Sequence, residues 1–405
     1  MKRILYIHHG GGIGGAPLSL LYLLRQLDPA RYEPIVVTLK DGPVVDLYRA
    51  EGIETQVTQG IDDFSHTTLE WYGGSMLWRL PGKLLHIPGS IRHTREVVRR
   101  FQPDLVHLNS STLAPSAIGA AREGVPIVWH IREPLTQGYL GLRRAWIRRV
   151  IDRHAARVVA ICQNDADQLI PSDRIRVIYN FVHFDQFDWS LTGDDFRAEM
   201  GIPADALVVL MLGGVSKPKG TLTLISALPA LVHRHPGLRL VIAGPPPLIH
   251  QESGLKGIAK RLLRVDAYRQ EVRKAIEDLD PAVRCTLLFT GIRKDVPAIL
   301  AASQCLVFPS NVPHFARPII EAAAMAVPSV ASDLGGPREL VDDGETGFLV
   351  PPPDPAALAD AISRLLADPP LARQMGERAY QHARQRFDAQ KNAAATIALY
   401  EELLS

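Results

Sequence analysis

Short apolar runs alternate with stretches of helical period along the whole chain. Apolar runs of roughly four to eight residues, each followed by an amphipathic stretch, are typical of βα units around a mostly parallel sheet. The pattern therefore predicts an α/β fold. The expected strands cover residues 3–8, 34–39, 104–108, 127–131, 158–161 and 175–178, and then residues 207–212, 239–243, 285–289, 305–308, 329–331 and 347–350.

The alternation is interrupted at residues 181–206, where Asp, Gly, Ser and Pro are frequent, as in a linker. A chain of 405 residues also exceeds the size of one ordinary core. We expect two Rossmann-like domains, residues 1–190 and 191–387, facing each other across a cleft. Residues 388–405 predict a last helix that packs back on the first domain.

The composition narrows the function classes. A net charge of +2, without a basic run interleaved with aromatics, argues against a nucleic acid as partner. Cys162, Cys285 and Cys305 are too few for a disulfide framework or a zinc site, and we expect them in the core. The N-terminus lacks the apolar stretch of a signal peptide, and no apolar run reaches the length of a membrane span. These features predict a cytoplasmic protein.

A glycine-rich loop follows the first expected strand. Gly10, Gly12 and Gly15 match the spacing G-x-G-x-x-G just before a helix, where backbone can approach a phosphate or a sugar. The match is weak by itself, because the second strand runs into Lys40 without the acidic residue of dinucleotide-binding proteins. A tight turn without a ligand remains the alternative.

A similar loop opens the second domain at residues 213–220. Lys219 lies next to an expected helix N-terminus, a place suited to a diphosphate, and Gly220 would leave the backbone open there. We interpret Lys217 as a solvated loop residue.

Glu321 is expected within the first turn of a helix that has Pro318 near its start. A carboxylate at this place gains from the helix dipole, which is a sufficient structural reason for its presence. Its functional alternative is to accept both hydroxyls of a ribose.

Two histidines lie near the ends of expected strands. His130 is followed by Arg132 and Glu133 at the edge where ligands bind in such folds, which favours a functional role. His107 is interpreted as a structural residue. No cluster of Asp, Glu, His or Cys has the spacing of a metal site, so we expect no metal cofactor.

The second half carries a long and specific resemblance. It resembles the signature block of the retaining GT-B glycosyltransferases of family 4, and further motifs of the first half fall in that family's order. The motifs are PS at 309–310, FARPIIEA at 315–322, VPSVASD at 327–333, GGPRELV at 335–341 and DGETGFLVP at 343–351, together with GG at 14–15, DLVH at 104–107, VWHIRE at 128–133, IYN at 178–180 and KG at 219–220.

The resemblance implies retaining transfer of a sugar from a UDP- or GDP-type nucleotide sugar to a polysaccharide or lipid-linked glycan. It implies that the loop of Gly14 and Gly15 closes near the donor diphosphate, and that His130 lies beside the reacting sugar. Lys219 then contacts the diphosphate, and Glu321 matches the second glutamate of the family's E-x7-E motif, which holds the donor ribose.

The chain departs from the family pattern at two positions. Pro313 replaces the first glutamate of E-x7-E, and Gly214 replaces the arginine that usually follows the strand-ending glycine. We expect the sugar hydroxyls to meet the turn at residues 314–317 instead. The resulting candidate residues are His130 and Lys219 for catalysis, and Gly14, Gly15, Gly214, Lys219, His314, Phe315, Ala316, Arg317 and Glu321 for donor binding.

Three other functions remain open at this point. A sugar-nucleotide epimerase of the same fold would turn over donor without an acceptor. A non-catalytic nucleotide-sugar-binding protein is motivated by Pro313 and Gly214. A dehydrogenase is a more distant alternative, which absence of nicotinamide binding would exclude.

Basic residues accompany apolar ones in the first domain. The stretch 142–153 places Trp146, Val150 and Ile151 on one side with arginines around them. Such a surface suits an anionic membrane leaflet, whereas ordinary helices with an inward apolar face explain the pattern equally well. The neighbouring stretch contributes Arg79, Lys83, Arg92, Arg95, Arg99 and Arg100 near Trp71, Trp78, Leu84 and Leu85.

Overall fold

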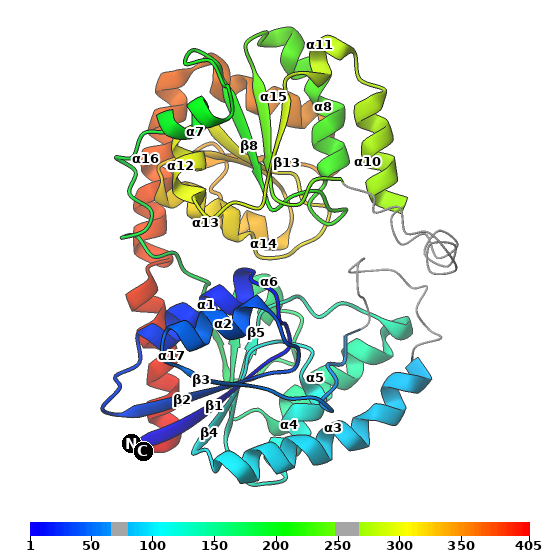
Figure 1. Ribbon diagram of the computed structural model, residues 1–405, viewed down its shortest axis with the longest axis vertical. Helices are drawn as coiled ribbons and strands as arrows, with labels where there is room; N and C mark the ends of the chain where they lie inside the picture. The colour runs from blue at the N-terminus through cyan, green and yellow to red at the C-terminus, as the bar shows by residue number, and fades with distance from the viewer. Residues whose placement is uncertain (66–79, 248–266) are drawn as a thin grey trace. The chain divides into compact units, whose positions relative to one another are not determined.

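The chain divides into two compact units, each built around its own parallel sheet (Figure 1). The first unit comprises Met1–Phe181 and Phe387–Ser405, and the second comprises Val182–Arg386. Phe181 is buried in a core of the first unit, so the border lies before residue 190. The computed structural model describes residues 1–65, 80–247 and 267–405.

The sheet of the first unit has seven strands in the order β3-β2-β1-β4-β5-β6-β7, and every neighbouring pair is parallel. β1 and β4 are adjacent although about a hundred residues separate them in the chain, because the connection from β3 returns across the sheet to the other side of β1. The strands are β1 (Lys2–His8), β2 (Tyr32–Thr38), β3 (Glu54–Val57), β4 (Leu105–Leu108), β5 (Ile127–Ile131), β6 (Arg157–Ala160) and β7 (Ile175–Val177).

Helices cover both faces of this sheet, and the alternation along β1 shows how. Ile4 and Tyr6 belong to one buried cluster, and Leu5 and Ile7 belong to another on the opposite face. The helices of the unit are α1 (Gly15–Arg25), α2 (Pro43–Ala50), α3 (Leu80–Phe101), α4 (Ala114–Ala121), the short 3-10 turn η2 (Tyr139–Gly141), α5 (Leu142–His154), α6 (Gln163–Ala166) and α17 (Ala389–Leu404).

The last helix, α17, belongs to the core of the first unit. Asp388 caps it by accepting a hydrogen bond from the backbone N–H of Lys391. Tyr400 is fully buried in the cluster that contains Tyr6, and Asn392 donates through Nδ2 to the carbonyl of Tyr179 at 3.0 Å. The end of the chain is therefore packed against strands formed near its beginning.

The second unit repeats the doubly wound plan with six parallel strands in the order β10-β9-β8-β11-β12-β13. Its strands are β8 (Val208–Leu212), β9 (Arg239–Ala243), β10 (Leu287–Gly291), β11 (Cys305–Phe308), β12 (Ser329–Ser332) and β13 (Gly347–Val350). Its described helices are α7 (Asp194–Glu199), α8 (Thr221–Arg234), α10 (Ala267–Glu277), α11 (Pro281–Arg284), α12 (Val296–Ala301), α13 (Arg317–Ala324), α14 (Gly335–Arg338), α15 (Pro355–Ala367) and α16 (Pro369–Arg386).

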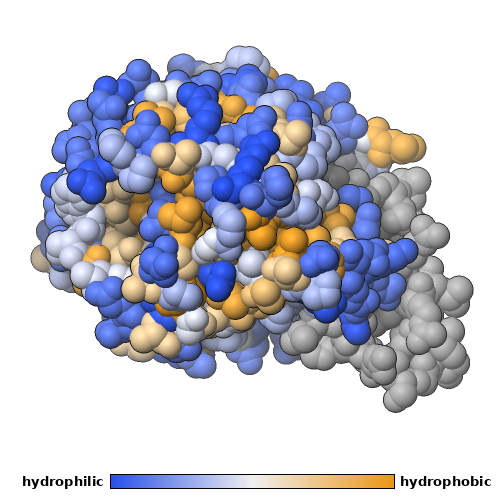
Figure 2. All heavy atoms as spheres, turned by 90° about the horizontal axis from the view of Figure 1, so that it is seen from above, coloured by the Kyte–Doolittle hydropathy of each residue, from blue (hydrophilic) through white to orange (hydrophobic). Residues whose placement is uncertain are grey.

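The surface is mixed in character. On the face seen from above in Figure 2, apolar residues form short streaks between hydrophilic ones, as is usual for a protein surface. Within the described ranges, no helix has the length and hydropathy needed to cross a bilayer. Two of the three cysteines, Cys162 and Cys305, are buried as expected, but Cys285 is exposed, because it follows the short surface helix α11.

Candidate functional site

The candidate residues lie at the carboxyl ends of strands, where α/β sheets bind ligands. In the first unit the strand order reverses between β1 and β4, and in the second unit it reverses between β8 and β11. Loops that follow the two strands of such a pair run to opposite faces of the sheet and open a crevice between them. We describe the edge of each unit separately.

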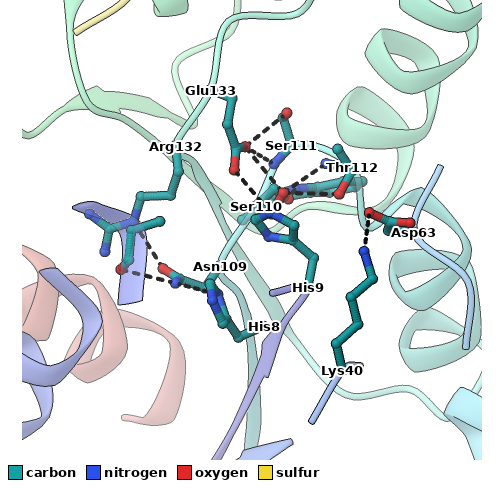
Figure 3. A network of polar contacts seen from close by, with 12 residues as sticks. His8, His9, Lys40, Asp63, Asn109, Ser110, Ser111, Thr112, Arg132 and Glu133 are labelled. Atoms are coloured by element: carbon teal, nitrogen blue, oxygen red, sulfur yellow. Dashed lines mark hydrogen bonds and ion pairs between the residues drawn. The ribbon is translucent and has the colours of Figure 1, made fainter. Parts of the chain in front are cut away.

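A chain of buried polar side chains runs along the edge of the first unit (Figure 3). Nδ2 of Asn109, just after β4, lies 3.1 Å from Nδ1 of His8 at the end of β1. Oδ1 of Asn109 accepts a hydrogen bond from Nε of Arg132 at 2.9 Å, and Arg132 also donates to Oδ1 of Asn180 at 2.5 Å. Amide oxygens carry no net charge, so these two bonds leave the positive charge of the guanidinium in place.

The same environment keeps His8 neutral. Burial, with His9 and Arg132 nearby, lowers the pKa of His8 to about 3. His8 therefore acts at neutral pH as a hydrogen-bonding group and not as a cation.

A fixed carboxylate lies beside this chain. Oε2 of Glu133 accepts hydrogen bonds from Oγ of Ser110 at 3.1 Å and from the backbone N–H and Oγ of Ser111 at 3.0 and 3.1 Å. Nε2 of His9 lies 3.7 Å from the other oxygen (Figure 3). Three donors on one oxygen hold the side chain in a single orientation.

His130 lies on β5 and is 3% exposed. Neither of its ring nitrogens has a hydrogen-bond partner among the described residues. Burial, then the charge of Arg132 and the neighbouring His107, holds the pKa of His130 well below its usual value, so the ring is neutral. Buried polar atoms without partners are costly, and a bound polar group that used them would remove this cost.

His107 packs against His130 with a ring-centroid distance of 5.3 Å. Nδ1 of His107 is hydrogen-bonded to the Tyr400 hydroxyl at 2.7 Å, which agrees with a structural role for this histidine. Its Nε2 has no partner within the described ranges. His107 and His130 are thus adjacent rings that each carry at least one nitrogen without a hydrogen-bond partner in the described part of the chain.

In the glycine loop of the first unit, one glycine is required by close packing, and two others have open space beside them. A Cβ added at Gly11 would lie 2.2 Å from the carbonyl oxygen of Asp41, so only glycine fits there. A Cβ at Gly12 or Gly14 would meet nothing within 4 Å. Gly14 precedes α1, which begins at Gly15 and has no side-chain cap, so the start of this helix offers backbone N–H groups to a ligand.

In the second unit, Lys219 lies in the loop between β8 and α8. Its Nζ donates to the carbonyl of Gly213 at 2.5 Å. Burial lowers the pKa of Lys219 to about 8. Asn311 holds this loop against the one after β11, donating to Pro218 through its backbone at 2.9 Å and to Lys217 through Nδ2 at 3.0 Å.

Gly214 and Gly220 are required by the backbone. Gly214 has a φ of +70°, and an added Cβ would lie 2.6 Å from the backbone nitrogen of Pro245. Gly220 has a φ of +69°, and an added Cβ would lie 1.7 Å from the carbonyl oxygen of Pro309. The expectation that Gly220 leaves an open backbone was wrong, because Pro309 covers it and its N–H donates to Lys217.

The residues expected to hold the donor cluster around the start of α13. Phe315 and Ala316 are buried before the helix, and Arg317 is its first residue. Nε of Arg317 donates to Oε1 of Glu321 at 2.7 Å. Glu321 is the fifth residue of α13 and therefore begins its second turn, whereas it was expected within the first turn, because α13 begins already at Arg317.

His314 precedes this pair. Its ring Nδ1 lies 3.2 Å from the carbonyl oxygen of Val312 and 3.4 Å from Oγ of Ser310. Burial is the main cause that lowers the pKa of His314 to about 4, and the charge of Lys219 acts in the same direction. Oγ of Ser310 also donates to the carbonyl of Pro218 at 2.9 Å, so the loops carrying His314 and Lys219 are in contact.

In the basic surface of the first unit, some of the apolar side chains are buried and others are exposed. Val150 and Ile151 are buried, and Trp146 packs on Phe64 with ring centroids 4.7 Å apart. The exposed apolar side chains are Leu84, Leu85, Leu140 and Leu142, at 51%, 78%, 88% and 66%. Arg79, Trp71 and Trp78 lie outside the described residues.

The polar chain at the first edge was only partly predicted. Arg132 and Glu133 were noted beside His130, but Asn109 and Asn180 were not identified as partners. Asn109 follows β4 directly and Asn180 lies three residues after β7, and this position after a strand is the signal that marks them. For the described part of the chain, no group of Asp, Glu, His and Cys is arranged to hold a metal ion.

Comparison with known proteins identifies related sequences over both units. A family described as Glycosyl transferases group 1 matches residues 193–382, and Glycosyltransferase Family 4 matches residues 13–186. The glycogen synthase of Mycobacterium tuberculosis is 30% identical over 75% of this chain and 69% of its own length. The D-inositol 3-phosphate glycosyltransferase of Streptomyces bingchenggensis is 33% identical over 62% of this chain, and the match spans 53% of that relative.

Solved structures share the fold along the whole chain. The Anabaena protein Alr3699/HepE, solved in complex with UDP, has a TM-score of 0.77 at 24% identity and covers 99% of this chain and 100% of its own. A glycosyltransferase from Rickettsia africae has a TM-score of 0.79 at 20% identity, covering 100% of this chain and 99% of its own.

Proposed function

Since the chain belongs to the group 1 glycosyl transferases of family 4, we propose that it moves a sugar from a nucleoside-diphosphate sugar to a glycan acceptor. The observation that carries this proposal is that the two family matches cover both units, residues 13–186 and 193–382. The acceptor in this proposal is a polysaccharide or a lipid-linked glycan. The complex of Alr3699/HepE with UDP favours UDP over GDP as the nucleotide.

The second unit holds the donor in this proposal. Lys219 and the N-terminus of α8 bind the diphosphate, and Glu321 holds the ribose while Arg317 fixes its orientation. Because Pro313 offers no carboxylate, the sugar hydroxyls are held by His314 and by the backbone N–H groups of Phe315 and Ala316 before α13. Gly214 contributes a close backbone approach only, since its conformation excludes a side chain.

The first unit supplies the acceptor side. The bond between the anomeric carbon and the diphosphate oxygen breaks, and a bond from the acceptor oxygen forms on the same face of the sugar. The acceptor proton passes to the departing diphosphate, whose charge Lys219 stabilises. His130 accepts or donates one hydrogen bond to the reacting sugar, and the loop of Gly14 and Gly15 lies against the diphosphate. No step of this scheme needs a metal ion.

The proposal also places the protein at the cytoplasmic face of a membrane. Lys83 donates to the carbonyl of Asp63 at 2.8 Å, and Nε of Arg143 donates to the carbonyl of Phe64 at 2.8 Å. These bonds tie the starts of α3 and α5 to adjacent residues, which supports a shared role of their exposed leucines and basic side chains in membrane contact. Binding to anionic vesicles that falls steeply with salt supports peripheral attachment; equal binding to neutral vesicles, or none, contradicts it.

A panel of nucleoside diphosphates and their sugar conjugates tests the proposed function. A ligand that binds only the folded protein raises its melting temperature. We expect one UDP-sugar to stabilise the protein and then to be consumed in the presence of an acceptor glycan. His130→Ala should keep donor binding but lose transfer by about a hundredfold. Stabilisation by no nucleotide would contradict the proposal.

A second candidate function is nucleotide-sugar binding without catalysis, which Pro313 and Gly214 favour because both remove a charged side chain of the family pattern. Binding of a nucleotide sugar with neither transfer nor hydrolysis would support it. Turnover of the donor without any acceptor would instead indicate an epimerase.

A further inference from the structure

A groove with an apolar floor and a basic rim lies between α4 and α5 of the first unit, with a volume of about 590 Å³. Ile118, Trp146 and Val150 line its apolar part, and Arg122, Arg149 and Arg153 line its basic part. The volume falls within the range of about 300–1,000 Å³ that is usual for small-molecule sites. The groove therefore has the size and the lining of a binding site.

The three arginines have no ion-pair partner among the described residues. The nearest carboxylates on the same elements are already used: Glu123 pairs with Arg95 and Arg99, and Asp152 pairs with Arg174. The positive charge at the rim is therefore not balanced by the described carboxylates of the unit. His154, also in the groove, has its pKa lowered by burial and then by the charges of Arg153 and Arg122, which indicates that these charges act on the groove.

The lining changes from mainly apolar to mainly basic along the groove. Trp146 is two turns before Arg153 on α5, a separation of about 10 Å along the helix. Ile118 is one turn before Arg122, which directly follows α4. Arg122 and Arg153 thus lie where the two helices end, Ile118 and Trp146 lie nearer their starts, and Arg149 lies beside Val150 between them. A ligand that fits has one anionic end and an apolar body.

The groove is also distinct from the candidate site. Both helices begin on the carboxyl side of the sheet, where His130 lies, and end on the amino side, where β5 and β6 start. The basic end of the groove therefore lies at the edge opposite to the polar chain of the first unit.

We propose that this groove binds a single anionic phospholipid, with its phosphate between Arg122, Arg149 and Arg153 and an acyl chain along Ile118, Trp146 and Val150. Arginine suits a phosphate because its planar fork offers several donors. An acidic amphipathic helix would carry charge along its whole length, which matches the one-ended rim less well. The inference depends on this groove alone and requires no glycosyl transfer.

Monomeric short-chain lipids test the proposal. The probes are dihexanoyl phosphatidylglycerol, dihexanoyl phosphatidylcholine and glycerol 3-phosphate, each titrated below any micelle concentration. We expect the anionic lipid to bind at least about tenfold more tightly than the neutral lipid or the head group alone. Equal binding of the two lipids, or of glycerol 3-phosphate and the anionic lipid, would overturn it.

A double variant of the groove and a matched control double variant test where the lipid binds. Arg122→Gln/Arg153→Gln should weaken binding of the anionic lipid by about tenfold or more, because two charged hydrogen-bond donors are lost. Arg273→Gln/Arg373→Gln removes the same charge from exposed helical positions of the second unit and should leave binding unchanged. Equal losses in both double variants would show a general charge effect and would refute the groove.

Trp146 provides a direct readout. An anionic lipid with bromine on its acyl chain should quench part of the tryptophan fluorescence in a saturable way, and Trp146→Phe should abolish that part. Trp146→Phe keeps an aromatic ring against Phe64, so folding can be checked by its unchanged unfolding transition. Quenching that persists in Trp146→Phe, or binding of an acidic helical peptide without binding of lipid, would overturn the proposal.

Discussion

The hydroxyl of Tyr400, in the last helix of the chain, lies 2.7 Å from Nδ1 of His107 in β4, and both side chains are fully buried. The same hydroxyl lies 3.4 Å from that of Tyr6 in β1. These two contacts of one hydroxyl join the end of the chain to two central strands of the first unit. The contact with His107 also fixes the ring that packs against His130.

Tyr400→Phe should destabilise the protein. The change leaves Nδ1 of His107 buried without a partner, which costs about 1–3 kcal/mol of the free energy of unfolding. Urea unfolding of the two proteins measures the difference. Tyr380→Phe is the control, because no hydrogen bond of the Tyr380 hydroxyl is present among the described residues; it should change stability by much less. Equal effects of the two substitutions would contradict the importance of this contact.

Binding of UDP should weaken as the pH rises above about 8. Lys219 has a pKa of about 8. Above pH 8, most lysines of the free protein therefore lack the positive charge that would contact the diphosphate. At pH 9 about one tenth of the lysines remain charged, and we expect affinity about tenfold lower than at pH 7.5. Isothermal titration calorimetry at several pH values checks this. Lys219→Arg should bind UDP without this pH dependence, because arginine stays protonated.

As the pH rises, Lys219 should increase the free energy of unfolding, whereas it should weaken UDP binding. Its pKa in the folded state lies below the usual value, so between about pH 8 and 10 the unfolded chain binds more protons. The free energy of unfolding contributed by this group therefore rises with pH in that window. Lys219→Ala should remove this contribution and weaken UDP binding by about ten- to a hundredfold, whereas Lys217→Ala should leave both nearly unchanged.

Replacing Gly214 by the arginine of the family pattern should destabilise the protein without improving nucleotide binding. Gly214→Arg introduces a Cβ that would lie 2.6 Å from Pro245, at a φ of +70° that costs a residue other than glycine about 1–2 kcal/mol. We expect a lower melting temperature and no tighter nucleotide binding. Gly237→Ala, where an added Cβ meets nothing within 4 Å, is the control and should be mild. A stable Gly214→Arg variant with tighter binding would show that the loop rearranges.

Most strands could be predicted from the sequence because buried parallel strands are continuous apolar runs. β5, β9, β11 and β13 begin and end at the predicted residues. β3 was missed, since Glu54, Thr55 and Gln56 are polar and the strand lies at the edge of the sheet. The strand predicted at residues 285–289 begins two residues later, because α11 and its C-cap occupy the chain as far as Cys285.

The candidate site was less predictable for a physical reason. Local pattern identifies residues that end a strand, but it does not tell which strands become neighbours. Asn109 meets His8 only because β1 and β4 are adjacent at the switch point. Likewise, the pairing of Arg317 with Glu321 depends on the residue at which α13 starts, and helix boundaries are the least certain part of a sequence-based assignment.

The replacement of the family's first glutamate by Pro313 gives the last prediction. In our proposal the turn at residues 314–317 holds the sugar, so Pro313→Ala should be mild while His314→Ala should lower transfer about tenfold or more. Arg317→Ala should impair both transfer and nucleotide binding, because it also frees Glu321, whose Nε partner is 2.7 Å away. Glu321→Ala should weaken nucleotide binding by about ten- to a hundredfold.

These four variants are compared with one UDP-sugar, by calorimetry for binding and by product formation for transfer. Wild-type transfer by both His314→Ala and Arg317→Ala would refute this account of the missing glutamate. A loss of nucleotide binding in Arg317→Ala that equals the loss in Glu321→Ala would mean that Arg317 only positions the carboxylate. A loss of transfer at Arg317 that exceeds its loss of binding would instead show that its guanidinium also contacts the sugar or the diphosphate.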